Sequence, residues 1–161
     1  MKLQGQVALI TGAGSGIGAA TARSMVMEGA QVAVAGLPAA GVEAVAAELK
    51  QAGASALAIP YDVADEAQSL AAVAQTVEHF GRLDIVVACA GIQQHREDVN
   101  LHELPAEIWD HTHDVNYRGV FLTCKYGLAQ MVKQGDGGVI VIVSSVTALN
   151  GRSNNPAYLS G

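Results

Sequence analysis

Short apolar runs alternate along the chain with longer amphipathic stretches. The apolar runs are rich in valine, alanine and isoleucine, and they cover residues 7–10, 31–35, 56–59, 85–88 and 139–143. Apart from Gln31 the runs are apolar at every position, which is typical of strands buried on both faces. Between the runs, apolar residues recur at helical spacing, as in Val42, Val45, Ala46 and Leu49 and again in Leu70, Val73, Val77 and Phe80.

The helical stretches also carry start and stop signals. Gly29, Gly53 and Gly81 follow the first three stretches, where glycine readily takes the left-handed conformation that ends a helix. Pro105 stands where a helix can begin without losing a hydrogen bond. The stretch from 109 to about 134 is helical in pattern, and we expect two segments there because Asn116 and Gly119 interrupt it.

This alternation predicts a single α/β domain over residues 1–161. Fully apolar strands between amphipathic helices indicate a parallel sheet covered on both faces, which is the Rossmann-like, doubly wound architecture. We expect the strand order 3-2-1-4-5. The pattern stops after the fifth strand, so we expect a domain that is truncated at its carboxyl end, with 139–143 as an exposed apolar edge.

Composition narrows the class of protein. Half of the residues are hydrophobic and 15% are charged, as in a globular domain, and the formal net charge of −6 argues against nucleic acid or anionic lipid as a partner. Cys89 and Cys124 form no disulfide framework. The chain enters its first strand directly after Gln6, which leaves no room for a signal peptide, and no apolar run approaches the ~20 residues of a membrane helix. We therefore expect a cytoplasmic protein.

A glycine-rich turn, Thr-Gly-Ala-Gly-Ser-Gly-Ile-Gly at residues 11–18, joins the first strand to the first helix. Glycines in such a turn let the backbone approach a pyrophosphate, and the helix amino terminus offers N–H groups and a positive dipole end. The strict G-x-G-x-x-G pattern is not met, because Ile17 occupies its last glycine position. Taken alone, the turn fits a tight strand-to-helix corner as well as a nucleotide site.

The pattern T-G-x-x-x-G-x-G resembles the cofactor fingerprint of the short-chain dehydrogenase/reductase family. Other segments agree with that family in order and spacing, namely residues 61–63, 83–91, 114–116 and 143–145 and Tyr158, thirteen residues beyond Ser145. The match departs from the family's N-N-A-G segment, where Ala88 and Cys89 replace both asparagines. The resemblance implies a hydride transfer between the nicotinamide of NAD or NADP and an alcohol or ketone.

The resemblance also assigns site residues. The implied cofactor-binding residues are Thr11, Gly12, Gly14, Ser15, Gly16, Ile17, Gly18, Gly36, Asp62, Val63, Ala90 and Gly91. Gly36 stands where NAD enzymes usually carry an acidic residue for the ribose, which permits a 2′-phosphate. Neither Leu37 nor Ser15 supplies the positive charge that NADP enzymes often place there. The sequence therefore leaves NAD and NADP both open.

The implied catalytic residues are Asn116, Ser145 and Tyr158. By the family's pattern, Tyr158 is the general acid/base, Ser145 hydrogen-bonds the substrate oxygen, and Asn116 positions a helix break and a water in a proton relay. Taken singly, these residues also fit a packing tyrosine, a strand-end cap and a helix interruption. The family's motif is Tyr-x-x-x-Lys, and the lysine would follow Gly161.

Because that lysine lowers the pKa of the tyrosine, we expect the 161 residues alone to show no appreciable turnover. A non-catalytic dinucleotide-binding protein and an inactive truncated fragment stay open as alternatives. The resemblance further implies a homo-oligomer, a dimer or tetramer, if the protein is longer. The sequence does not identify the substrate.

Histidines raise the question of a metal site. His111 and His113 are two residues apart in a helical stretch and point to different sides, so they would not converge on one ion. We expect no metal. Gln93, Gln94 and His95 follow the fourth strand at the edge where ligands bind in such folds, and we expect a solvated loop there rather than substrate contacts.

Overall fold

The computed structural model describes residues 1–150 and 154–161. Its five strands form a parallel sheet in the order β3-β2-β1-β4-β5, as the sequence predicts. The strands are β1 (Val7–Thr11), β2 (Gln31–Gly36), β3 (Ala56–Pro60), β4 (Ile85–Ala88) and β5 (Val139–Ile142). The expected Rossmann-like, doubly wound fold is confirmed.

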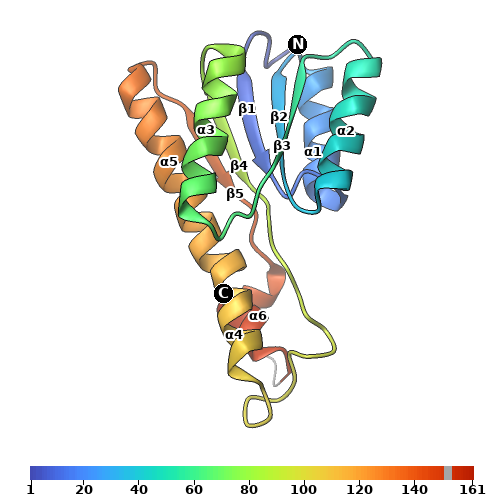
Figure 1. Cartoon of the computed structure of the whole chain (residues 1–161), viewed down its shortest axis with the longest axis vertical. Helices are drawn as coiled ribbons and strands as arrows, with labels where there is room; N and C mark the ends of the chain where they lie inside the picture. The colour runs from blue at the N-terminus through green and yellow to red at the C-terminus, as the bar shows by residue number, and fades with distance from the viewer. Residues whose placement is uncertain (151–153) are drawn as a thin grey trace.

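Helices cover both faces of this sheet (Figure 1). The helices are α1 (Gly16–Met27), α2 (Ala39–Gln51), α3 (Glu66–Phe80), α4 (Ala106–His113), α5 (Gly119–Gln134) and α6 (Pro156–Ser160), with a π-helical turn over Asp114–Arg118 and a 3-10 turn over Val146–Leu149. One core cluster joins the sheet to α1 and α2, and a second joins it to α3 and α5. Among the described residues, none of the helices is long and apolar enough to span a bilayer.

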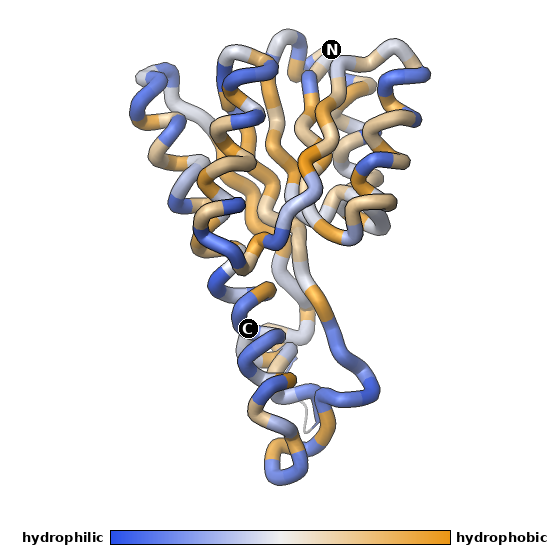
Figure 2. The backbone as a smooth tube through the Cα atoms, viewed as in Figure 1, coloured by the Kyte–Doolittle hydropathy of each residue, from blue (hydrophilic) through white to orange (hydrophobic). Residues whose placement is uncertain are grey.

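Alternation along the strands divides the core between these two clusters. Ile10 and Val87 pack on the side of α1 and α2, whereas Leu9 and Val86 pack on the side of α3 and α5. All four side chains are buried, which explains why β1 and β4 carry apolar residues on both faces. Figure 2 shows the apolar residues concentrated in the sheet, while much of the extension that carries α4 is hydrophilic.

The core face of α3 matches the expectation at Val73, Val77 and Phe80 but not at Leu70. Leu70 is 52% exposed, and the buried positions are Ser69, Ala72, Val73 and Thr76. The hydroxyl groups of Ser69 and Thr76 donate to the carbonyl oxygens of Val63 and Ala72, at 3.2 and 2.8 Å. Because these bonds satisfy the hydroxyls, the small polar residues can be buried while a leucine faces outward.

The interruption expected between 109 and 134 is a π-helical turn. α4 begins at Ala106, directly after Pro105, and the chain passes through residues 114–118 into α5. Asn116 lies in the middle of this wider turn, and Gly119 begins α5. A π-helical turn fits one more residue into the helix without breaking it and is frequent at functional sites. The expected interruption is present, but it does not break the helix.

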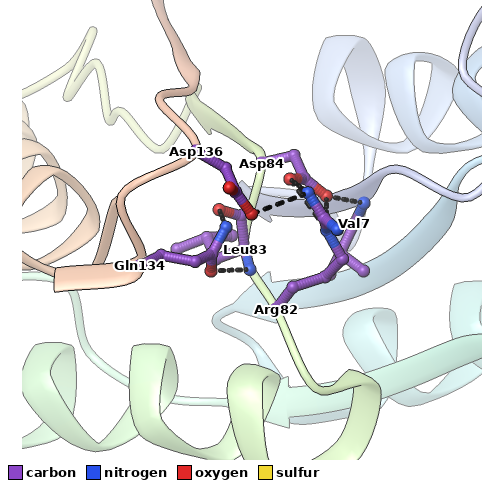
Figure 3. Close-up of polar contacts among 6 residues, drawn as sticks. All are labelled: Val7, Arg82, Leu83, Asp84, Gln134 and Asp136. Carbon is purple, nitrogen blue, oxygen red and sulfur yellow. Dashed lines mark hydrogen bonds and ion pairs between the residues drawn. The ribbon is translucent and has the colours of Figure 1, made fainter. Parts of the chain in front are cut away.

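Asp84 links three strands at the amino-terminal edge of the sheet, and Figure 3 shows its side-chain contacts with Val7 and Arg82. The Asp84 carboxylate accepts a hydrogen bond from the backbone N–H of Val7 at 2.9 Å and forms an ion pair with Arg82 at 2.6 Å. Its backbone carbonyl accepts from Val139 N–H, at the start of β5. Nearby, the Gln134 side chain exchanges two hydrogen bonds with the backbone of Leu83. These contacts fix β1, β4 and β5 relative to one another.

The opposite, carboxyl edge of the sheet leads into an extension of the molecule. The loop after β4, α4 and α6 lie beyond the strand ends (Figure 1). β5 forms the outer strand on that side, and Val139, Val141 and Ile142 are 56, 44 and 56% exposed. The apolar edge strand expected from the sequence is therefore exposed in the structure.

Candidate functional site

A cleft of about 1250 Å³ lies at the carboxyl edge of the sheet. Segments at the carboxyl ends of all five strands line it, together with the π-helical turn, α5 and α6. In open α/β sheets this edge is where ligands bind. Of the residues predicted for the site, Gly12, Ser15, Gly16, Ile17, Gly18, Gly36, Asp62, Val63, Ala90, Gly91, Asn116, Ser145 and Tyr158 line the cleft.

The glycines of the turn do two different jobs. A Cβ on Gly12 would lie 2.8 Å from the Cα of Ala90, and one on Gly14 would lie 2.9 Å from the backbone nitrogen of Val42. Both positions therefore need glycine so that backbones can touch. Gly16 has a φ of +51°, and no described atom lies within 4 Å of where its Cβ would be. Its missing side chain keeps the cleft open at the amino terminus of α1.

The amino terminus of α1 presents its amides to this cleft. Ser15 is the N-cap residue and is exposed, but its side chain caps no amide of the first turn in the described residues. That turn carries no acidic side chain. Uncapped first-turn amides and the positive end of the helix dipole together suit an anion such as a phosphate.

Thr11 and Gly14 do not line the cleft, unlike the other predicted cofactor residues. Thr11 is 1% exposed, and its hydroxyl oxygen accepts hydrogen bonds from the backbone N–H groups of Cys89 and Ala90, both at 3.1 Å. Gly14 packs against the start of α2. These two residues support the cleft without lining it. Thr11 joins the end of β1 to the end of β4, and Gly14 lets the turn pack against α2.

Gly36 and Asp62 lie on the β2 and β3 side of the cleft. A Cβ on Gly36 would be 3.1 Å from the backbone nitrogen of Gly12, so β2 and the glycine-rich turn meet through two glycines. The Asp62 carboxylate accepts from Ala64 N–H at 2.9 Å and lies at the cleft wall. Val63 is buried, and its side chain packs against Gly119 at the start of α5.

Asn116 connects the π-helical turn to the loop after β4. Its amide oxygen accepts from Ile92 N–H at 2.8 Å, and its amide nitrogen donates to the Ile92 carbonyl at 2.9 Å. Both ends of the side chain are thus engaged by one backbone. The residue thereby fixes Ile92, next to Gly91, beside the cleft.

Ser145 and Tyr158 approach the cleft from the segment after β5. Ser145 caps the 3-10 turn, and its oxygen accepts from the N–H and the hydroxyl of Thr147, at 3.2 and 2.8 Å. Both bonds use Ser145 as acceptor, so its own O–H can still donate into the cleft. Tyr158 is half-buried on α6 and lines the same cleft.

Tyr61, directly after β3, also lines the cleft, but it has a strongly raised pKa. Burial raises the pKa of Tyr61 to about 12, against the weaker opposing effect of hydrogen bonds with Thr123 and Ser69. A phenol held so strongly in its neutral form is unsuited to acid/base chemistry at neutral pH. Burial likewise raises the pKa of the Cys89 and Cys124 thiols, which line the cleft, so neither is an activated nucleophile.

Some residues of the extension behave differently from the sequence expectations. Gln93 and His95 are exposed, as expected of a solvated loop, although Gln93 also lines the cleft. Gln94 is half-buried and donates to Ile108 O and Thr112 Oγ1. His111 faces the cleft, while His113 contacts Trp109 O and Ser160 Oγ. No group of three or more potential metal ligands comes together in residues 1–150 and 154–161.

Asp98 is a residue that sequence reasoning missed. It is 2% exposed and bonds the backbone of α6, 59 and 60 residues further along the chain. It stands in a polar loop among exposed charged residues, and its spacing carries no motif. No local signal in the sequence distinguishes it from Glu97 or Glu103.

A sequence model of the family described as short chain dehydrogenase matches residues 6–161. The chain belongs to this family. An oxidoreductase of unassigned role from Thermotoga maritima is 45% identical over 158 residues, covering 98% of this chain and 61% of that protein. An L-rhamnose 1-dehydrogenase (NAD(P)(+)) from a Sphingomonas species is 37% identical, covering 97% of this chain and 61% of that protein.

Solved structures of the family agree with the fold. The crystal structure of a short-chain type dehydrogenase/reductase from Mycobacterium marinum matches with a TM-score of 0.91 and 34% identity. The match covers 99% of this chain and 64% of that one. The chain thus spans about three fifths of the length of the relatives it resembles.

Proposed function

We propose that the protein is an NAD(P)-dependent oxidoreductase that transfers a hydride between nicotinamide and an alcohol or ketone. The observation that carries the proposal is the cleft itself. It joins the glycine-rich turn, which suits a dinucleotide, to Asn116, Ser145 and Tyr158, which suit proton transfer at a substrate oxygen. The family membership and a relative named for NAD(P)(+) support this choice of cofactor.

The residues present fit a dinucleotide. Gly16 leaves open space at the amino terminus of α1, and the amides of that helix would hold the pyrophosphate. Asp62 would contact the adenine end, and Ala90 and Gly91 would flank the nicotinamide half. When bound, the nicotinamide accepts or supplies the hydride. The proposal covers NAD and NADP alike, since Gly36 and Leu37 bring neither a carboxylate nor a cation to the end of β2.

The side chains of this chain would handle the proton. Tyr158 would donate a proton to the carbonyl oxygen in reduction, or remove it from the hydroxyl in oxidation. Ser145 would donate a hydrogen bond to the same oxygen and stabilise negative charge that develops there. Asn116 would hold the loop after β4 and the π-helical turn in place, next to the proton path.

Assembly and location complete the proposal. α5 carries exposed apolar side chains, among them Phe121, Leu128 and Val132, and we propose that such faces are covered in a homo-oligomer. The partners are small-molecule alcohols or ketones, not nucleic acid or membrane. A cytoplasmic location fits two cysteines that stand as thiols.

Replacing Tyr158 tests the proposed chemistry. In a protein extended beyond Gly161 to include the lysine of the motif, NAD(P)H formation from a panel of secondary alcohols should fall about 10²–10⁴-fold in Tyr158→Phe, because a positioned acid/base contributes that much. Tyr117→Phe is the matched control, since Tyr117 also lines the cleft but is 69% exposed. Equal turnover in Tyr158→Phe and wild type would contradict the assignment, and dinucleotide binding without any turnover would favour a non-catalytic binding protein.

A further inference from the structure

Asp98 is a buried carboxylate in a loop whose other acidic residues face solvent. It lies between β4 and α4 and is 2% exposed, whereas Glu97 and Glu103 are exposed. A carboxylate is expensive to bury unless hydrogen bonds stabilise its charge. Both of its oxygens accept such bonds. Oδ1 accepts from Ala157 N–H at 3.1 Å, and Oδ2 accepts from Tyr158 N–H at 2.9 Å.

These two N–H groups belong to the first turn of α6, the helix that carries Tyr158. The first turn of any helix has amides without intrahelical partners, and α6 begins with Pro156, which has no N–H. The residue that would normally cap the turn, Asn155, has a φ of +64° and makes no side-chain cap among the described atoms. The cap therefore comes from Asp98, and the bonds are charge-assisted.

The loop that holds Asp98 is fixed in turn to α4. The backbone N–H of Asp98 donates to the Gln94 carbonyl at 2.8 Å. The Gln94 side chain donates to Ile108 O and to Thr112 Oγ1, at 3.3 and 3.0 Å, both on α4. At the other end of α6, Ser160 Oγ lies 3.2 Å from His113 Nε2, also on α4. α6 is thus held at its first turn by the loop after β4 and at its last residues by α4, and Gln94 joins that loop to α4.

We propose that Asp98 is a positioning residue for Tyr158. Its carboxylate caps α6 from the loop after β4 and so sets where the Tyr158 side chain enters the cleft. The loop that leaves β4 at Ala90 and Gly91 is then tied to the helix that delivers the proton donor. This inference rests on the proposed function for the role of Tyr158, but the capping contact itself does not.

The capping contact can be measured in the native chain. An NMR experiment that detects scalar coupling across hydrogen bonds should correlate the amide nitrogen of Tyr158 with the side-chain carboxyl carbon of Asp98. This needs no variant, so it also decides the matter if a substituted chain fails to fold. Absence of the correlation, in a sample where backbone correlations across β1 and β2 are seen, would overturn the proposal.

Asp98→Asn tests how firmly the cap holds α6. An amide retains one acceptor oxygen but turns an NH₂ group toward the other N–H, so hydrogen exchange of the Ala157 and Tyr158 amides should speed up by about tenfold or more. Glu97→Gln, an exposed neighbour, should leave both rates unchanged. Amides of β1 report whether the fold survives. Unchanged exchange at Tyr158 in folded Asp98→Asn would overturn the proposal.

A second readout separates positioning from mere stability. With ring-labelled tyrosine, addition of NAD⁺ or NADP⁺ should shift the Tyr158 signal in wild type and in Glu97→Gln, and the shift should be reduced in Asp98→Asn at an equal bound fraction. An equal shift in Asp98→Asn would overturn the positioning role. If wild type binds neither dinucleotide, the proposed function fails, while the exchange and coupling results still decide whether Asp98 caps α6.

Discussion

Two glycines of the turn at residues 11–18 share a left-handed backbone but differ in their surroundings. Gly12 and Gly16 have φ values of +65° and +51°. A Cβ at residue 12 would clash with the backbone of Ala90, whereas at residue 16 it would enter open space. Both positions therefore favour glycine for its left-handed backbone, but only Gly12 also needs it for lack of space.

Substituting both positions with alanine should give unequal losses of stability. Gly16→Ala should lower the free energy of unfolding by about 1 kcal/mol, the cost of the left-handed conformation. Gly12→Ala should lower it by about 2 kcal/mol more, because a backbone must move to make room. Urea unfolding measures both. Equal losses in the two variants would show that the close approach of Ala90 is not what requires glycine at residue 12.

At this scale the sequence predicts residues that belong to a motif and misses residues that act through distant contacts. Asn116, Ser145 and Tyr158 were predicted from the resemblance to the family, and they line one cleft with most of the glycine-rich turn. Thr11 was predicted as a cofactor residue, yet its hydroxyl is taken by the backbone at the end of β4, 78 and 79 residues away. Asp98 was not predicted, because its partners lie 59 and 60 residues away.

At the scale of the secondary-structure elements, the contact between Asp84 and β1 should make the stability of the fold depend on pH. Burial opposes ionisation of Asp84, but the hydrogen bonds from Arg82 and Val7 N–H and the attraction of the guanidinium prevail and lower its pKa. A lowered pKa in the folded state stabilises the fold above the unfolded value, near ~3.9, and that stabilisation disappears as pH falls through the folded value.

Asp84→Asn should therefore cost stability at neutral pH but not in acid. We expect the free energy of unfolding to fall by about 2 kcal/mol at pH 7, the scale of hydrogen bonds to a charged group. The difference from wild type should shrink below about pH 4. Asp136→Asn is the control, since Asp136 is 67% exposed and lies 3.8 Å from Arg82. A difference that stays constant between pH 7 and pH 3 would contradict the role of the carboxylate charge.

Element types and order were predictable, while the details of two helices were not. Apolar runs predicted all five strands, because a parallel sheet buries both faces, and the order followed from the doubly wound architecture assigned to them. On α3, Leu70 was wrongly expected to be buried, because hydroxyl groups bonded to backbone carbonyls can be buried in place of leucine. The π-helical turn was expected only as an interruption, and the residue pattern carried no signal for its wider geometry.

The whole molecule combines a well-buried sheet with an exposed side. The edge strand β5 and the outer face of α5 carry exposed apolar residues, and the extension places α6 against α4. The cleft lies between the sheet and the extension. The proposed cofactor site and the proposed proton donor therefore both depend on how the extension sits on the sheet. The glycine-rich turn comes from the first strand of the chain and Tyr158 from its last helix.

The measurement that tests the proposed function most directly is a titration of dinucleotide binding at the amino terminus of α1. Calorimetric titration of NAD⁺ and NADP⁺ should show saturable binding of at least one by wild type. Ser15→Glu should weaken it about tenfold or more, since a carboxylate would repel the pyrophosphate while suiting the helix dipole. Ser24→Glu adds the same charge at the exposed far end of α1 and should bind like wild type. No saturable binding of either dinucleotide by wild type, or Ser15→Glu binding equally well, would contradict a dinucleotide held at this turn.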